Sequence, residues 1–219
     1  METIQLNPKG VQRQMKHIIF DFDGTLADST KVFMSAWNNL ADKYHYKKIK
    51  LDELESLKKL SIMERSKLFN FPLYKIPIYI PQFYRLYNQS IKDVHLIGGM
   101  KGLLKELKKK GYTITIISSN DKENILEFLK LNKIDTVTNV ICSSRIFGKD
   151  KIIHKYLKDQ HLKPSEVIYV GDEQRDIVAC KKVGIPIIWV SWGYDAIEVV
   201  QSEKPDYKVY APAEILEII

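Results

Sequence analysis

Two carboxylates separated by one residue follow a short apolar run near the start of the chain. Residues 17–20 read HIIF, the composition of a buried strand, and Asp21, Asp23 and Gly24 come directly after them. Like charges at a strand end repel, and each raises the pKa of the other. A divalent cation bound between them removes that repulsion. A polar turn uses the same residue types, so this stretch alone favours neither interpretation.

A second strand end carries carboxylates later in the chain. Residues 167–172 read VIYVGD, and Asp176 follows Asp172 four positions on. A turn followed by an acidic helix start would explain the pattern without a site. However, the carboxyl ends of parallel strands meet at one edge of a sheet, so the repetition of strand-end acids favours a shared metal site. Glu173 is a competing ligand, and Arg175 is expected to form ion pairs.

Hydroxyl and amide side chains end another predicted strand. The apolar residues 112–117 lead into Ser118, Ser119 and Asn120. Asn120 and Glu123 have the spacing of a capping box, which predicts a helix start at this point. A helix N-terminus flanked by hydroxyls can bind an anion. Turn and cap roles alone are the commoner explanation for such residues.

A lysine, Lys149, follows a glycine just before another predicted helix. Its ammonium group there would neutralise both a nucleophilic carboxylate and the oxygens of a phosphoryl group. A lysine in a lysine-rich chain is usually a solvated surface group, so the position alone is weak evidence.

Strands and helices alternate through the second half of the chain. Such alternation, with apolar strands, predicts an α/β fold whose parallel sheet is covered on both faces. The expected strands span about 17–20, 112–117, 138–142, 167–170, 185–190 and 207–210, and the expected helices about 100–111, 122–131 and 151–159.

A helical block interrupts this alternation. Residues 31–93 carry apolar side chains at helical spacing, and no strand is expected between the first strand and the end of this block. Pro81 is predicted in the first turn of a helix that runs to about Lys92. The α/β domain is therefore expected to contain an inserted helical domain directly after its first strand.

The positive charge is concentrated in the inserted block. The 219-residue chain has a net charge of +7, and residues 31–93 hold 12 Lys or Arg against 6 Asp or Glu. A basic surface attracts anions. The block contains no recognisable nucleic-acid-binding motif, so a solvated lysine-rich face is the preferred interpretation and no nucleic acid partner is expected.

The compartment is predicted from cysteines and hydropathy. Cys142 and Cys180 are isolated and follow apolar residues, which is typical of reduced core thiols, and no zinc-type spacing occurs. No apolar run is long enough to span a bilayer, and the N-terminus lacks the apolar core of a signal peptide. A cytoplasmic protein without a membrane partner is expected.

Taken in order, these clusters resemble the four motifs of the haloacid dehalogenase (HAD) superfamily, in the form found in its phosphoglycolate-phosphatase-like branch, subfamily IA. The resemblance covers nearly the whole chain from about residue 16. It implies a Rossmann-like parallel sheet core (the HAD fold) formed by residues 16–30 and 94–219. It also implies an inserted α-helical cap of the C1 type at residues 31–93 and an N-terminal tail at residues 1–15.

The resemblance assigns the acids to one Mg2+-dependent centre. Asp21 would be the nucleophile and would also bind the metal. Asp23 would be the general acid and base, with its backbone carbonyl on the metal. Asp172 would be a direct metal ligand, and Asp176 would act through water or orient the ligands.

The resemblance also assigns the phosphoryl contacts. Ser118 would bind the transferring phosphoryl group, with Ser119 as the alternative if the register is off by one. Lys149 would be the motif III lysine, although Asp150 stands where many relatives have proline, which leaves Lys151 as a weaker candidate. The remaining residues expected to contact the substrate are Thr25, Ser119, Asn120 and Arg65.

The implied activity is a Mg2+-dependent phosphatase that hydrolyses a small phosphorylated metabolite through an aspartyl-phosphate intermediate, as a monomer or homodimer. A phosphomutase uses the same core residues, and a non-catalytic binding or regulatory module on this fold is the alternative from another class. Arg65, Lys67 and Arg85 are expected to give the cap a positive field over the site.

Overall fold

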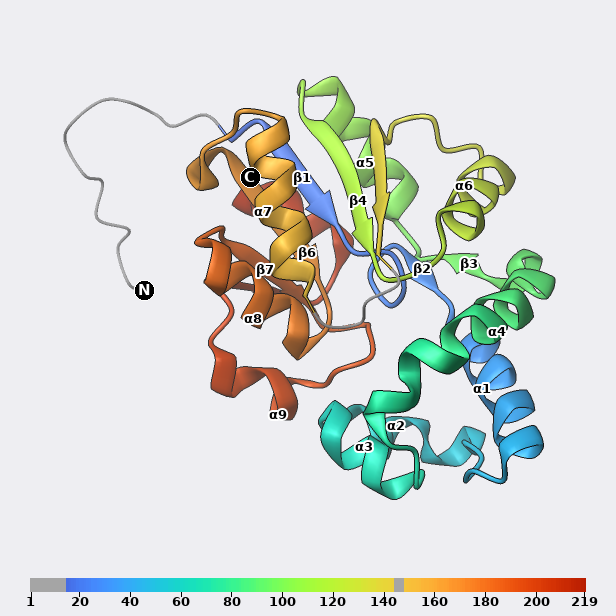
Figure 1. Cartoon of the computed structure of the whole chain (residues 1–219). Coiled ribbons are helices and arrows are strands. Elements are labelled where there is room, and N and C mark those ends of the chain that lie inside the picture. Colours follow the sequence, from blue (N-terminus) through green and yellow to red (C-terminus); the bar gives the residue numbers. More distant parts are fainter. Residues whose placement is uncertain (1–14, 144–147) are drawn as a thin grey trace.

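A six-stranded parallel sheet forms the centre of the molecule (Figure 1). The structure, a computed structural model, describes residues 15–143 and 148–219. The expected tail therefore lies almost entirely outside the described residues. The strand order is β5-β4-β1-β6-β7-β8. The strands are β1 (His17–Phe20), β4 (Thr113–Ser118), β5 (Asn139–Cys142), β6 (Val167–Gly171), β7 (Ile187–Val190) and β8 (Tyr207–Val209).

Helices cover both faces of this sheet, as alternating strands and helices require. Side chains alternate along β1, so that Ile18 and Phe20 face one helical layer and Ile19 faces the other. One layer consists of α5 (Met100–Lys109), α6 (Lys122–Leu131) and α10 (Ile215–Ile218), and the other of α7 (Lys149–Asp159), α8 (Gln174–Val183) and α9 (Ile197–Val200).

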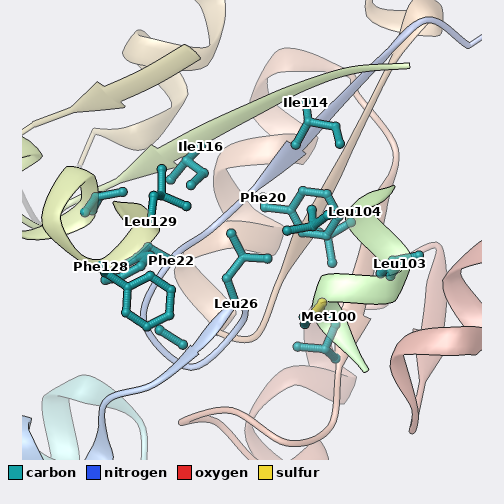
Figure 2. Packing of buried hydrophobic residues seen from close by; sticks show 14 of the residues in the cluster. Phe20, Phe22, Leu26, Met100, Leu103, Leu104, Ile114, Ile116, Phe128 and Leu129 are labelled. Atoms are coloured by element: carbon teal, nitrogen blue, oxygen red, sulfur yellow. The ribbon is translucent and has the colours of Figure 1, made fainter. Parts of the chain in front are cut away.

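The first layer buries large apolar side chains against the sheet. Figure 2 shows Phe20, Leu26 and Leu104 packed together, with Phe22 and Phe128 close by. The rings of Phe22 and Phe128 meet edge to face, with centroids 5.0 Å apart. This packing fixes the chain immediately on either side of Asp21, since Phe20 and Phe22 are both fully buried.

A second group of helices is inserted between β1 and β4. It comprises α1 (Thr30–Tyr44), α2 (Leu54–Lys58), α3 (Ile62–Leu68) and α4 (Ile76–Gln89) and stands beside the sheet (Figure 1). The group has its own apolar cluster around Trp37, Leu57 and Phe69. We call this group the cap. The predicted fold class, a parallel α/β core with an inserted helical cap, is confirmed.

The two connections to the cap pair with each other. β2 (Ala27–Asp28) and β3 (His95–Leu96) form a short antiparallel ladder. The expectation that no strand follows the first one before residue 93 was therefore wrong. A two-residue strand carries too little alternation to be recognised in a sequence.

The starts of α4 and α7 and the N-cap of α6 differ from the expected ones. α4 begins at Ile76 with Pro77 in its first turn, so Pro81 lies inside the helix instead of starting it. The N-cap of α6 is Asp121, whose carboxylate accepts a hydrogen bond from the backbone N–H of Glu123, and not Asn120. α7 begins at Lys149, two residues before the expected start.

Both cysteines are free thiols, as expected from their isolation. Cys180 is buried and Cys142 is half-buried. Within residues 15–143 and 148–219, no helix combines the length and the hydropathy that crossing a bilayer requires.

We predict that Phe128→Ala lowers the free energy of unfolding by about 3–5 kcal/mol, because removal of the fully buried ring leaves a cavity beside Phe22. Denaturant unfolding of wild type and variant measures the difference. Leu126→Ala on the same helix is the control, since Leu126 is 47% exposed. Equal losses for the two variants would contradict the packing described for Phe128.

Candidate active site

Asp21 extends the central strand by one residue toward the site. Its backbone N–H donates to the carbonyl of Val170, which continues the pairing of β1 with β6. Alternation along the strand places Asp21 on the face of Ile19, where α7 and α8 pack. Asp21 is buried, and one carboxylate oxygen accepts a hydrogen bond from the N–H of Phe22 at 2.7 Å.

Lys149 reaches the site from the first turn of α7. Its Nζ lies 2.8 Å from Asp21 Oδ2 and 2.5 Å from Asp176 Oδ1. Burial alone would lower the pKa of Lys149, but the two carboxylates outweigh it and the pKa is raised. The lysine is therefore a fixed positive charge on the nucleophile candidate. Lys151, its alternative, is exposed one residue beyond Asp150.

Asp172 sits in a cradle made by two glycines. A Cβ on Gly24, where φ is +77°, would lie 2.3 Å from Asp172 Oδ2, and a Cβ on Gly193 would lie 2.1 Å from Asp172 Cβ. The carboxylate accepts hydrogen bonds from the Thr25 hydroxyl at 2.7 Å and from the Tyr194 N–H at 2.7 Å. Only residues without a side chain allow the backbone this close, so the cradle fixes the carboxylate.

Three buried carboxylates converge at this edge of the sheet. Asp21, Asp172 and Asp176 each offer an oxygen atom within 4.8 Å of those of the other two. Burial raises the pKa of Asp172, and the negative charges of Glu173, Asp21 and Asp176 add to the effect. A hard divalent cation prefers oxygen ligands of this kind and would offset the excess negative charge. The donor set therefore fits a divalent metal ion.

Asp23 accepts hydrogen bonds from a different set of side chains than Asp21 does. Its Oδ1 accepts hydrogen bonds from the hydroxyls of Ser29 at 2.6 Å and Tyr87 at 2.7 Å, and its Oδ2 accepts one from Asn120 Nδ2 at 2.8 Å. Burial raises the pKa of Asp23, and these three donors oppose that rise. A carboxyl group that has a raised pKa and lies outside the cluster of Asp21, Asp172 and Asp176 is suited to proton transfer.

The end of β4 adds hydroxyl groups to the same edge. Ser118 Oγ accepts a hydrogen bond from the backbone N–H of Asn120 at 3.1 Å. Ser119 Oγ accepts one from Arg175 at 3.2 Å, and Arg175 also pairs with Glu173 as expected. Ser118 and Ser119 both line the cavity described next, so either serine is placed to bind the phosphoryl group.

A cavity of about 270 Å³ lies between the cap and this edge of the sheet. Asp21, Asp23, Ser118 and Ser119 line its floor. Its walls come mainly from apolar side chains of the cap, among them Phe33, Met34, Leu57, Phe69, Ile80 and Phe83. The cavity therefore joins the acids to an apolar chamber in the cap.

The cavity wall is mainly apolar and gives no support to the expected positive field of the cap, which stays a prediction. Lys67 and Arg85 are exposed and do not line it. Arg65 does, but its guanidinium pairs with Asp195 at 2.7 Å and donates to backbone carbonyls, including that of Tyr194 at 3.0 Å. Arg65 thus ties the cap to the loop after β7, while most cap lysines stay in solvent, where their charge is best hydrated.

Two other residues expected to contact the substrate support the acids instead. Thr25 is fully buried against Asp172, and Asn120 donates to Asp23, so neither lines the cavity. Ser29 stands at the N-cap position of α1, but its hydroxyl donates to Asp23 and does not cap the helix.

Two tyrosines at the site were missed by the sequence reasoning. Tyr87 from α4 donates to Asp23, and the Tyr194 hydroxyl lies 2.6 Å from Ser29 Oγ. Helical periodicity marks Tyr87 only as a buried position, and the loop after β7 has no spacing signal. A tyrosine hydroxyl on a buried face needs a polar partner, which was the one available hint for Tyr87.

The chain belongs to the haloacid dehalogenase-like hydrolase family, whose model matches residues 18–190. It is therefore an enzyme of this hydrolase family, with the expected parallel core and cap. Among curated proteins, it is 27% identical to the phosphoglycolate phosphatase of Synechococcus elongatus, over 94% of this chain and 97% of that protein. It is 24% identical to the pyrophosphatase PpaX of Bacillus mycoides, over 92% and 95% of the two chains.

Solved structures share the fold. A haloacid dehalogenase-like hydrolase from Streptococcus pneumoniae superposes with a TM-score of 0.76 at 22% identity, covering 93% of this chain and 98% of that one. A predicted phosphoglycolate phosphatase from Haemophilus somnus gives a TM-score of 0.76 at 20% identity, covering 95% and 99%.

We predict that Gly193→Ala weakens divalent metal binding at least about tenfold, because the added methyl group displaces Asp172 from its cradle. Isothermal titration with Mg2+ and Mn2+ measures the change. Gly98→Ala is the matched control, since a Cβ there meets nothing within 4 Å. Unchanged affinity in Gly193→Ala would show that Asp172 does not contribute to the metal site.

Proposed function

We propose that the protein is a Mg2+-dependent phosphatase that hydrolyses a phosphomonoester through a phosphoryl group held on Asp21. The convergence of Asp21, Asp172 and Asp176 within 4.8 Å of one another, with Lys149 on Asp21, carries this proposal. Its family and the phosphatase names of its curated relatives agree with it. Asp21, Asp172 and Asp176, with the backbone carbonyl of Asp23, would hold the metal.

The side chains of Lys149 and Ser118 would assist Asp21 as the nucleophile. Lys149 places a positive charge 2.8 Å from Asp21 Oδ2 and, together with the Ser118 hydroxyl, would bind the oxygens of the transferring phosphoryl group. When bound, Mg2+ supplies further positive charge to the same oxygens. The Asp21 carboxylate then attacks phosphorus, and the bond between phosphorus and the alcohol oxygen breaks.

Asp23 would serve as general acid and then as general base. It gives its proton to the departing alcohol oxygen, and as a carboxylate it accepts a proton from the water that attacks the phosphorus. That attack breaks the bond between phosphorus and Asp21, releases inorganic phosphate and restores both carboxyl groups. Ser29, Tyr87 and Asn120 position Asp23 for both transfers.

We predict that Asp21→Asn lowers phosphate release by roughly 10⁴-fold or more, because the amide cannot attack phosphorus. Release from p-nitrophenyl phosphate with and without Mg2+ measures the effect, and a chelator should abolish wild-type activity. Asp52→Asn is the control, since Asp52 is exposed on the cap. Wild-type rates in Asp21→Asn would refute the proposal, while phosphoryl transfer to a sugar without phosphate release would indicate a phosphomutase.

We predict that Tyr87→Phe lowers kcat/KM about tenfold for an alkyl phosphate and much less for p-nitrophenyl phosphate, because kcat/KM reports the step in which the leaving group departs and not the later attack of water. The variant loses the 2.7 Å hydrogen bond to Asp23, and only the alkyl leaving group depends on a proton from that acid. Steady-state kinetics with both substrates measure the difference. Tyr44→Phe is the control, because the Tyr44 hydroxyl donates to Gln82 within the cap. Equal losses on both substrates would indicate a merely structural role for Tyr87.

A further inference from the structure

Five aromatic rings form an arc over the catalytic acids. They are Phe33, Phe83, Tyr84, Tyr87 and Tyr194, all of which line the cavity. The ring centroids of Phe33 lie 4.9 Å from Phe83 and 5.7 Å from Tyr194. Those of Phe83 and Tyr84 are 5.5 Å apart, and those of Tyr84 and Tyr87 are 6.5 Å apart. We call this set the aromatic arc.

The polar ends of the arc point into the catalytic edge. Tyr87 donates to Asp23, and Tyr84 donates to the carbonyl of Ser119 at 2.5 Å. Both hydroxyl groups therefore already form hydrogen bonds within the protein. The carbon atoms of the rings remain for contact with a ligand in the cavity. The arc thus offers apolar contact rather than hydrogen bonds to whatever lies next to Asp23.

Phe33 is the most exposed member of the arc. It is 38% exposed although it lies on α1 next to the cavity, beside Phe83 and Tyr194. Exposed aromatic surface is unfavourable in water, and its burial by an apolar ligand group is favourable. Phe33 lines the same cavity as Asp21 and Asp23, so its ring is available to contact the organic part of a phosphomonoester bound at these acids.

Cations in the cavity wall are already paired. The basic side chains that line it among the described residues are Lys58, Arg65 and Arg175. Arg65 pairs with Asp195 and Arg175 with Glu173, and both carboxylates are buried, whereas the pair of Lys58 with Glu55 lies at the surface. A leaving group that carries its own carboxylate or phosphate would therefore lose hydration beside Arg65 and Arg175 without gaining either of them as a new ionic partner.

We infer that the preferred substrate is a phosphomonoester whose organic group is apolar or aromatic, with that group held against the aromatic arc. This inference rests on the proposed phosphatase function and specifies its substrate class. The 270 Å³ chamber has the necessary room, because an apolar cavity of about 150 Å³ already binds benzene. The class differs from the compounds in the names of the curated relatives, phosphoglycolate and pyrophosphate, which are small and strongly anionic.

Three phosphate esters of alcohols test the inference: ethyl phosphate, 2-phenylethyl phosphate and 2-phosphoglycolate. All three esters have alkoxide leaving groups. Differences in kcat/KM among them therefore report the binding of the organic group more than the chemistry of the leaving group. With Mg2+ present, kcat/KM for 2-phenylethyl phosphate should exceed that for each of the others at least about tenfold. A value for 2-phosphoglycolate that equals or exceeds it would overturn the inference.

Variants locate the preference in the arc. Phe33→Ala should reduce the ratio of 2-phenylethyl to ethyl phosphate hydrolysis at least about fivefold, and Phe33→Leu should reduce it less, because leucine keeps apolar surface. Tyr74→Ala is the matched control, since Tyr74 is a cap aromatic that is 76% exposed and does not line the cavity. An unchanged ratio in both Phe33 variants would place the organic group elsewhere and overturn the assignment to the arc.

Failure of the inference can be told apart from failure of the proposed function. Phosphate release from the three esters without the predicted preference contradicts only the substrate class. No release from any ester contradicts the phosphatase proposal, and calorimetric binding of the same esters to the Asp21→Asn protein then tests the cavity by itself. In that experiment, 2-phenylethyl phosphate binding no tighter than ethyl phosphate would overturn the inference.

Discussion

Burial of several carboxylates beside one lysine is the constraint on which the site depends. Asp21, Asp172 and Asp176 lie together at the carboxyl edge of the sheet, and Lys149 contacts two of them. Buried charges of one sign are costly unless they are paired, so the ammonium group of Lys149 stabilises the arrangement, and a cation among the oxygens would stabilise it further. The parallel sheet makes this possible because β1 and β6 are neighbours and end at the same edge.

The cap connects to this charge cluster through Asp23 and the loop after β7. Tyr87 brings α4 onto Asp23, and Arg65 brings α3 onto Asp195, whose other oxygen accepts from the Gln174 N–H at the start of α8. The cap is therefore bonded both to Asp23 and to the loop that contacts the start of α8. The aromatic arc lines the cavity at this junction.

Much of this arrangement was predictable from the sequence, because strand-end acids and alternating elements are local patterns. The convergence of Asp21, Asp172 and Lys149 was expected from such patterns together with the family resemblance, and the inserted cap was expected from helical spacing. The lining of the cavity was not predictable. Counting charges predicted a basic cap. Which cap side chains face the cavity depends instead on how the four cap helices pack against one another. Lys67 is exposed to solvent, whereas Phe33 lines the cavity.

Direct detection of a phosphoryl group on Asp21 would decide the mechanism. Acid quenching of the enzyme during turnover of a good substrate, followed by peptide mass spectrometry, should find one added phosphoryl group on the peptide that contains Asp21, and none in Asp21→Asn. Phosphate release in a steady state with the label on another side chain, or with no covalent phosphoryl group on millisecond quenching, would contradict the role given to this residue.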